Sequence, residues 1–479
     1  MKLLQGNLSF LTLGILAVAA GTMLENTMVA MLISILIAFI SFYKKETGLI
    51  FLVIFIPLRP FLITMNPGFK ILGDAIIGLL LIRTFWDYRR DYKKLFTFHP
   101  FEWAFFAFGI IGVLSALITD VSIKSIIFQL RAYFLFYLVF YVVKRMEIRL
   151  DTIRKMAITT FILGVILSLQ GIIEKISHKT MLMPQEWQEW WLSPTNRIRV
   201  YGLLKGPNEL SLYLLIAFII SLLLLKYVHG KMRYAIYAGL SLIGTTFLLT
   251  YSRGTLLTLI VFLLVYIVLN RKWKPLVSIG LVSLVSFGLF YGVNQAADQY
   301  YGHYLSDTSY EEQGEESETE SEGGKRFKNT FSDETIGQSN TSGRIYYVKK
   351  AIEIFKDHPI IGTGFGTFGG AATLAYSSPI YENYGIETNF YSDNQYILIL
   401  AETGVLGMLA ILLIGYILLK ITWKNRKEFS SPLLIYLFVA LIVGGTVYNI
   451  LENDTFMMFY FILLGIVLNQ NNNIKHRVM

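Results

Sequence analysis

Two runs of the sequence decide the fold: LYLLIAFIISLLLL at residues 212–225 and LLTLIVFLLVYIVL at residues 256–269. A surface helix of a soluble protein keeps a polar face toward water, whereas a helix that is apolar all round is buried or lies in lipid. The chain has 479 residues, of which 54% are hydrophobic and only 16% are charged. Runs and composition together predict a membrane protein and exclude an ordinary soluble domain.

The apolar runs predict an all-α fold, a polytopic transmembrane helical bundle of about 12–14 spans, since about 17–25 apolar residues cross a bilayer. The expected spans are 6–23, 27–43, 47–64, 71–86, 101–118, 125–143, 156–174, 207–226, 234–251, 254–270, 275–293, 390–420, 432–449 and 453–470. Pro57, Pro60 and Pro67 interrupt the third and fourth of these. The first run lacks a convincing cleavage site and a second run follows it, so we expect a span rather than a signal peptide.

Basic residues predict the orientation of these spans, because loops rich in Lys and Arg stay in the cytoplasm. With both termini cytoplasmic, each cytoplasmic loop carries a basic cluster, at 44–45, 89–94, 144–155, 226–233, 271–274 and 420–427. The net charge of +9 therefore reflects membrane topology. We expect the lipid bilayer as a partner and no nucleic acid.

This orientation divides the chain into four parts. They are N-terminal helices in 1–174, central helices with an outer loop at 175–206 in 175–293, an extracytoplasmic loop at 294–389, and C-terminal helices in 390–479. The extracytoplasmic loop contains DTSYEEQGEESETESEGG, residues 307–324, which has too few apolar residues to fold and is expected to be disordered. Ser342 can cap an amphipathic helix that runs through Phe355, and we expect this helix to lie flat on the membrane.

The sequence predicts no metal and no cofactor. It contains no cysteine, and its six histidines are scattered without the spacing of metal ligands. The glycine-rich run 362–366 follows no strand and opens no dinucleotide-binding helix, so we expect a flexible re-entrant turn. Trp187, Trp190 and Trp191 are typical of an aromatic anchor in the membrane interface, and stacking on a sugar stays open as the alternative.

Five basic residues lie on the expected outer side against the charge bias: Arg197, Arg199, Lys205, Arg253 and Arg344. A guanidinium in or beside a membrane needs an anionic partner. One candidate is a protein carboxylate such as Asp393 or Glu402, and the other is a phosphate, which suits the planar fork of arginine. Residue types alone leave both alternatives open. Several converging cations would suit a diphosphate, and a lipid diphosphate is the natural ligand of this kind at a membrane surface.

Four sequence blocks follow one another on this expected outer side. They are Arg199-Val200-Tyr201-Gly202 with Gly206-Pro207-Asn208-Glu209-Leu210; Thr250-Tyr251-Ser252-Arg253-Gly254; Gly343-Arg344 with 359–366; and Asp393-Asn394-Gln395-Tyr396 with 402–407. Each block alone is too short to identify a family, but the order of the four blocks and their shared position on the expected outer side of the membrane are specific. Together they resemble the O-antigen ligase and Wzy-type polysaccharide polymerase family, over residues 195–410.

The resemblance implies a site for an undecaprenyl-diphosphate-linked oligosaccharide donor and a glycan acceptor. The residues implied to bind the diphosphate are Arg199, Lys205, Arg253 and Arg344. The implied catalytic base is Asp393, and the supporting residues are Asn208, Asn394 and Glu402. The ligases carry His before Asn where this chain has Asp393-Asn394, a departure that argues against a lipid A core acceptor but keeps the reaction class. Lipid diphosphate leaves as a stabilised anion, so one base suffices, and direct displacement would invert the anomeric centre.

The leading hypothesis is a metal-independent, inverting glycosyltransferase that polymerises lipid-linked repeat units into an exported polysaccharide, such as a capsule or a teichuronic-type wall polymer. It would span a bacterial plasma membrane with its site outside, alongside a possible flippase and chain-length regulator. The alternatives are ligase-like transfer to another acceptor, and a transporter or flippase of lipid-linked oligosaccharide or a small solute. A transporter places its ionisable residues near the midplane, whereas this sequence concentrates them outside.

Overall fold

The computed structural model confirms the all-helical bundle. It describes residues 2–181, 184–190, 192, 194–270, 274–307 and 343–469, and these ranges contain no strand. Within them, nine helices are long and apolar enough to cross a membrane, and four shorter apolar helices at 9–23, 27–43, 431–444 and 454–467 add to them. The chain is therefore a polytopic, multi-pass membrane protein.

The helices follow the apolar runs closely. Those of the first half are α1 (Lys2–Met23), α2 (Thr27–Tyr43), α3 (Lys45–Met65), α4 (Leu72–Asp87), α5 (Pro100–Ile118), α6 (Ile123–Val143), α7 (Leu150–Ile176), α8 (Gln185–Gln188), α9 (Pro194–Arg197) and α10 (Pro207–Leu224). Those of the second half are α11 (Lys231–Leu249), α12 (Arg253–Asn270), α13 (Lys274–Asp307), α16 (Arg344–Asp357), α17 (Ala371–Tyr376), α18 (Gln395–Lys424), α19 (Ser431–Gly444) and α20 (Asp454–Val467).

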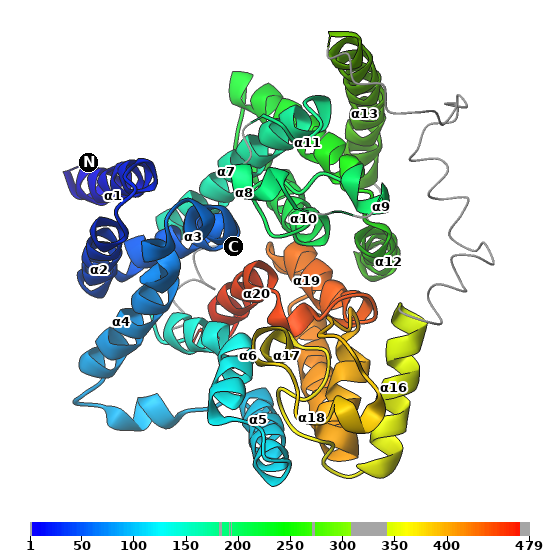
Figure 1. Ribbon diagram of the computed structural model, residues 1–479. Coiled ribbons are helices and arrows are strands. Elements are labelled where there is room, and N and C mark those ends of the chain that lie inside the picture. The colour runs from blue at the N-terminus through cyan, green and yellow to red at the C-terminus, as the bar shows by residue number, and fades with distance from the viewer. Residues whose placement is uncertain are drawn as a thin grey trace.

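Helix α20 lies in the middle of the bundle, in contact with α3, α6, α10 and α19 (Figure 1). Nearly all of its side chains are buried. Around it, α2 packs on α4, α7 on α10 and α11, α12 on α19, and α5 on α18. The last helix of the chain therefore links elements from both halves of the sequence.

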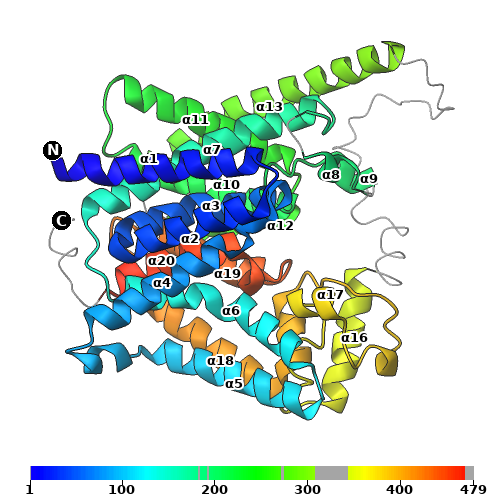
Figure 2. The same cartoon turned by 60° about the vertical axis from the view of Figure 1, so that its left-hand side comes forward.

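The two ends of the bundle differ in what they carry. Helices α8, α9, α16 and α17 gather at one end, with the segments 177–206 and 343–394 (Figure 2). We call this the loop end. The opposite end carries the connections 144–149, 225–230 and 425–430, which hold several of the basic clusters.

Two boundaries differ from the sequence-based expectation. Helix α13 continues to Asp307 instead of ending at residue 293, because residues 294–301 contain neither Gly nor Pro to stop it. All but the first residue of the expected disordered run 307–324 lies outside the described residues. The expected amphipathic helix is α16, but its N-cap is Gly343, it ends at Asp357 instead of Phe355, and the expected cap Ser342 lies outside the described residues. Helix α16 buries Ala351 and Ile354 and packs against α18. Ile345 and Ile352 stay exposed on it, so an apolar stripe remains available to the membrane surface.

Helix α18 breaks at Gly404, which has φ 58° and ψ −155°. The break removes Val405 and Leu406 from the regular pattern, and their amides donate instead to the carbonyls of Pro359 and Ile360 at 2.8 and 3.1 Å. Non-helical backbone inside a membrane bundle is tolerated where protein satisfies its polar groups. The segment before the glycine-rich turn provides these partners.

Hydrogen bonds and close packing hold the glycine-rich turn at 362–366 between α5 and α18, and the flexibility expected for it stays a prediction. The amides of Thr363 and Gly364 donate to the carbonyls of Ala401 and Glu402 at 3.0 and 2.7 Å, on the other side of the break in α18. Gly364 has φ 96°, and a Cβ there would lie 2.0 Å from the backbone nitrogen of Ala116 in α5. The turn is thus a wedge between α5 and α18. These contacts involve residues distant in the sequence, so local composition does not reveal them.

Candidate functional site

Arg199 joins three segments at the loop end. Its guanidinium donates to the carbonyl of Thr250 at 2.8 Å, to Oδ1 of Asn208 at 2.5 Å and to Oδ1 of Asn196 at 3.3 Å. The residue is only 8% exposed. These three acceptors are neutral oxygens, and they hold the guanidinium in place.

The backbone that follows Arg199 is fixed by the buried carboxylate of Glu174. This carboxylate accepts hydrogen bonds from the amides of Tyr201 at 3.0 Å and Gly202 at 2.7 Å, and it pairs with Lys179 at 2.5 Å. In the structure it anchors the first block of the resemblance.

Ser252 connects the start of α12 to the start of α10. Its Oγ donates to Oδ1 of Asn208 at 3.1 Å and lies 2.7 Å from the hydroxyl of Tyr448. The preceding residue, Tyr251, has φ 48°, a left-handed conformation that is strained for a bulky side chain and is often found at functional sites. Burial raises the pKa of Tyr448, so its hydroxyl stays protonated and keeps its capacity to donate.

Arg344 and Asp393 face each other at the same end. Nη2 of Arg344 lies 3.4 Å from Oδ2 of Asp393 and 3.4 Å from the carbonyl of Val447. The two side chains are 53% and 40% exposed, so a ligand can reach both. This ion pair is long and singly bonded, and a stronger anion could draw the guanidinium away.

Asp393 has the environment of a carboxylate with raised proton affinity. Burial raises the pKa of Asp393 above its ordinary value, and Arg344 and Arg199 offset only part of that rise. Asp393 also has φ 48°, a left-handed conformation that aspartate tolerates better than most residues. A carboxylate in such a position can take a proton from a hydroxyl.

The electrostatics at this point favour an anion. Four helices, α10, α12, α16 and α18, begin within the blocks that meet here. A helix start carries partial positive charge and unpaired amide donors. Arg199 and Arg344 add positive charge beside Asp393, and two further carboxylates, Glu209 and Glu452, lie within electrostatic range of the neighbouring Tyr391. The arrangement can hold a phosphate-bearing molecule while a base acts on a second substrate.

Four of the site residues predicted from sequence thus come together: Arg199, Asn208, Arg344 and Asp393. Arg253 is the first residue of α12, directly after Ser252, and its side chain is exposed. Lys205 is also exposed and lies within electrostatic range of Glu209. These two cations stand at the margin of the cluster.

The other two predicted residues support the backbone. Oδ1 of Asn394 caps α18 by accepting from the amides of Tyr396 and Ile397 at 3.0 and 3.2 Å. Oε1 of Glu402 accepts from the amides of Gly366, Thr367 and Phe368. Glu402 therefore holds the segment that follows the glycine-rich turn.

The connection between α19 and α20, residues 445–453, contributes residues that sequence reasoning missed. Its Tyr448 contacts Ser252, its Asn449 accepts from the amide of Asn394 at 3.1 Å, and its Glu452 accepts from the amide of Ala371 at 3.1 Å. The available signal was a run of polar residues, Asn449, Glu452, Asn453 and Asp454, between two apolar helices.

Trp187 also differs from its expected role. It is 3% exposed, packs edge to face on Phe61 and donates to Oγ1 of Thr64 at 3.1 Å. It holds the 177–206 segment to α3 rather than to lipid. Trp190 stacks on Trp187 and keeps 37% of its surface exposed.

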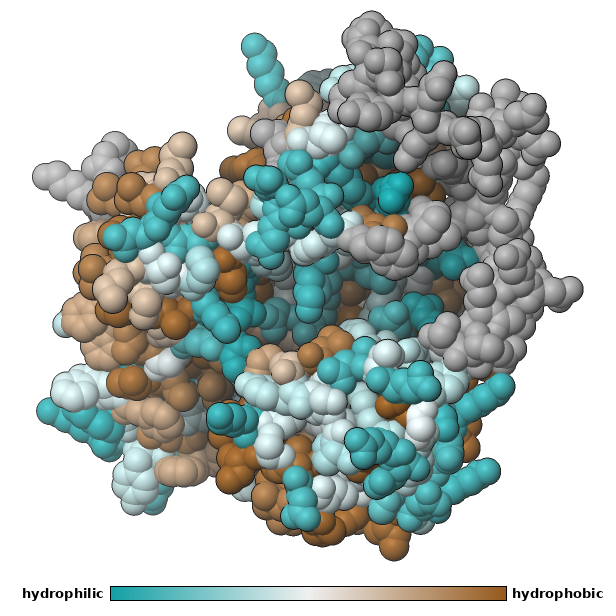
Figure 3. Space-filling view, in the orientation of Figure 1, coloured by the Kyte–Doolittle hydropathy of each residue, from teal (hydrophilic) through white to brown (hydrophobic). Residues whose placement is uncertain are grey.

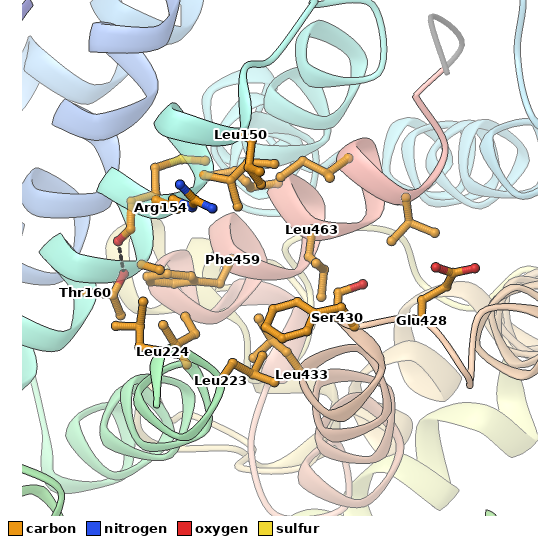
Figure 4. A pocket seen from close by; sticks show the side chains of 18 of the residues that line it. Leu150, Arg154, Thr160, Leu223, Leu224, Glu428, Ser430, Leu433, Phe459 and Leu463 are labelled. Atoms are coloured by element: carbon orange, nitrogen blue, oxygen red, sulfur yellow. Dashed lines mark hydrogen bonds between the residues drawn. The ribbon is translucent and has the colours of Figure 1, made fainter. Parts of the chain in front are cut away.

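The face viewed in Figure 3 shows hydrophilic side chains around a hollow near its centre, with hydrophobic side chains toward its margins. A separate cavity of about 220 Å³ lies between α7, α10, α19 and α20, near the opposite end of the bundle (Figure 4). Its lining is mostly Leu, Ile and Phe, with Arg154 and Glu428 among its few charged residues. It lacks the paired cations and the base of the loop end. Within the part of the chain that the structure describes, no cluster of three or more His, Asp or Glu could hold a metal.

Comparison with known proteins agrees with the resemblance drawn from the four blocks. Residues 238–412 match the family model described as O-Antigen ligase. This range includes Arg253, Arg344, Asp393 and Glu402, whereas Arg199 and Asn208 precede it. The chain matches no curated protein.

Proposed function

We propose that this membrane protein polymerises lipid-diphosphate-linked repeat units, and the match of residues 238–412 to the O-Antigen ligase family model supports glycan transfer as its reaction class. The observation that carries the proposal is the convergence of Arg199 and Arg344 on Asp393 and Tyr448. The donor would be an undecaprenyl-diphosphate-linked oligosaccharide. The loop end would face outward from a bacterial plasma membrane, since basic clusters mark the opposite end as cytoplasmic.

Arg199 and Arg344 hold the diphosphate in this proposal, and Lys205 and Arg253 at the margin add positive charge. A diphosphate carries more negative charge than one guanidinium offsets, so cations from separate segments are needed. Positive charge that is already in place stabilises the anion that develops as the glycosidic bond breaks. Ser252 and Tyr448 add hydroxyl donors beside the two arginines.

Asp393 acts as the base. It takes the proton of an acceptor hydroxyl, whose oxygen forms a bond to the anomeric carbon of the donor sugar. The bond from that carbon to the diphosphate oxygen breaks, and the lipid diphosphate leaves as an anion held by the arginines. Attack opposite the leaving group inverts the anomeric centre. Determination of the product linkage tests this step, and retention of configuration would rule it out.

The experiment that tests the function replaces Asp393 or Arg253 by Ala in cells whose surface glycan depends on this chain. We expect loss of long glycan chains, with single repeat units still present, because donor supply does not need the site. Arg197→Ala, an exposed arginine at the end of α9, is the matched control and should leave the glycan unchanged. An unchanged polymer in both site variants would contradict the assignment.

The acceptor separates a polymerase from a ligase, because both bind the same kind of donor. Glycan found on a second type of acceptor, with normal chain length in the variants, would favour ligase-like transfer. The exported polymer we propose is a capsule or a wall polymer of the teichuronic kind.

A further inference from the structure

A second cluster of ionised side chains lies at the loop end, among α3, α4, α6 and α20. It consists of Arg59, Asp74, Arg131 and Asp454, and we call it the charge quartet. Nη1 of Arg59 donates to Oδ2 of Asp454 at 2.7 Å, and Arg131 binds Asp74 through two hydrogen bonds of 2.8 and 2.7 Å. Asp454 also lies within electrostatic range of Arg131 and Asp74, so the two pairs form one group.

The charge quartet faces the space enclosed by its four helices. Helix α3 packs on α4, α4 on α6, α6 on α20 and α20 on α3, and each helix contributes one member (Figure 1). Nevertheless Arg59 is 19% exposed, Arg131 and Asp454 are each 30% exposed, and Asp74 is 41% exposed. The polar atoms of the charge quartet are therefore partly accessible, although the four helices that carry them pack on one another.

The charge quartet lies toward the loop end. Asp74 and Asp454 lie in the first turns of α4 and α20, and both helices begin there. Arg59 lies six residues before the end of α3, about 9 Å along its axis, and Arg131 lies eight residues into α6, about 12 Å. All four members therefore occupy the half of the bundle nearest the candidate site.

Two connections link the charge quartet to Asp393. Tyr391 lies within electrostatic range of Asp393 and Glu209, and Glu209 lies within range of Asp454. Tyr448, beside the arginines of the site, precedes Asp454 by only six residues, so these two lie at most about 20 Å apart. A glycan whose reacting hydroxyl sits at Asp393 can thus reach the charge quartet with its next sugars.

The chemistry of the charge quartet differs from that of the diphosphate site. Its two guanidiniums are each paired with a carboxylate, so the group is neutral overall and has little attraction for phosphate. Carboxylates accept hydrogen bonds from sugar hydroxyls, and guanidinium N–H groups donate to sugar oxygens. Alternating donors and acceptors of this kind suit a polyhydroxylated chain. We infer that the charge quartet binds the glycan acceptor, behind the hydroxyl that Asp393 deprotonates. This inference rests on the proposed function.

The test uses full-length protein and replaces the carboxylates without changing their size, as Asp74→Asn and Asp454→Asn. The loss of one charge-assisted hydrogen bond should weaken acceptor binding about tenfold. The growing glycan would then leave after fewer additions, and gel analysis of cell-surface polymer should show shorter chains. Undecaprenyl diphosphate is the probe for the donor site, and its affinity for the purified variants should stay within about twofold of the unmodified protein.

Two controls separate binding from a structural role. Asp87→Asn breaks the 2.6 Å pair of Asp87 with Lys45, which joins the same helices α3 and α4 at the opposite end, and it should leave chain length unchanged. The exchange Asp74→Arg with Arg131→Asp keeps an ion pair but moves each charge to the other helix. We expect this exchange to retain the melting temperature and still to yield short chains.

The outcomes are distinct. Unchanged chain length in Asp74→Asn and Asp454→Asn overturns the inference, as does a parallel loss of affinity for undecaprenyl diphosphate. Restored chain length in the exchanged pair also overturns it, because a purely structural pair behaves in that way. Failure of the unmodified protein to bind undecaprenyl diphosphate at all would instead defeat the proposed function itself.

Discussion

Replacement of Arg199 by Lys tests whether the shape of the guanidinium, and not only its charge, builds the site. Nε binds the carbonyl of Thr250 and Nη2 binds Asn208, at 2.8 and 2.5 Å. A single ammonium group cannot occupy both nitrogen positions, so at least one charge-assisted hydrogen bond is lost. That loss costs about 1.5–3 kcal/mol in holding the cation at the site, so the affinity for a diphosphate should fall by at most about ten- to hundredfold.

The assay is binding of undecaprenyl diphosphate to purified full-length protein, with the melting temperature measured in parallel. Arg197→Lys is the matched control, because Arg197 lies two residues earlier and is exposed. We expect that control to bind as the unmodified protein does. If the affinity of Arg199→Lys for undecaprenyl diphosphate stays within about twofold of the unmodified protein, then the planar shape of the Arg199 guanidinium is not needed for binding. An equal loss of affinity in both variants would lead to the same conclusion.

Three further predictions concern the base and the backbone that supports it. The rate of glycan transfer should rise with pH as Asp393 loses its proton, and this rise should occur above the ordinary pH range for aspartate because the pKa of Asp393 is raised. The substitution Asp393→Asn should abolish transfer and its pH dependence, while binding of undecaprenyl diphosphate is retained. Glu402→Ala leaves three buried amides without their acceptor and should lower the free energy of unfolding by about 3 kcal/mol or more. Glu402→Gln keeps an acceptor oxygen, so its free energy of unfolding, measured by thermal unfolding, should fall far less. Gly364→Ala should prevent stable folding because the added Cβ meets the backbone of Ala116. Gly385 also has positive φ but lies in open space, so Gly385→Ala should lower the free energy of unfolding by only about 1 kcal/mol. Similar melting temperatures for the two variants would contradict this reasoning.

The bilayer explains why the fold could be read from the sequence. Spans such as 207–226 and 254–270 were recognisable because lipid requires long apolar runs, and they correspond to α10 and α12. The end of α13 was misjudged because a helix can continue past the apolar run when nothing stops it. The contacts of the turn at 362–366 could not be predicted because its partners lie in α5 and α18.

The candidate site was predictable only in part, for a similar reason. Arg199, Arg344 and Asp393 stood out by charge placement and by resemblance, and the structure brings them together. Neither charge placement nor the family resemblance singled out Tyr448 and Asp454 in the sequence. Their roles arise from contacts with Ser252 and Arg59, and no local pattern encodes such distant pairings.

The connection 445–453 has a consequence for biogenesis. A ribosome makes this connection late, after Arg199, Ser252, Arg344 and Asp393 have already emerged and entered the membrane. Those groups lack Tyr448, Asn449 and Glu452 as neighbours until the last two helices insert. Polypeptides that end before residue 445 lack all three of these neighbours, so we expect the candidate site to be assembled only when synthesis of the chain is nearly complete.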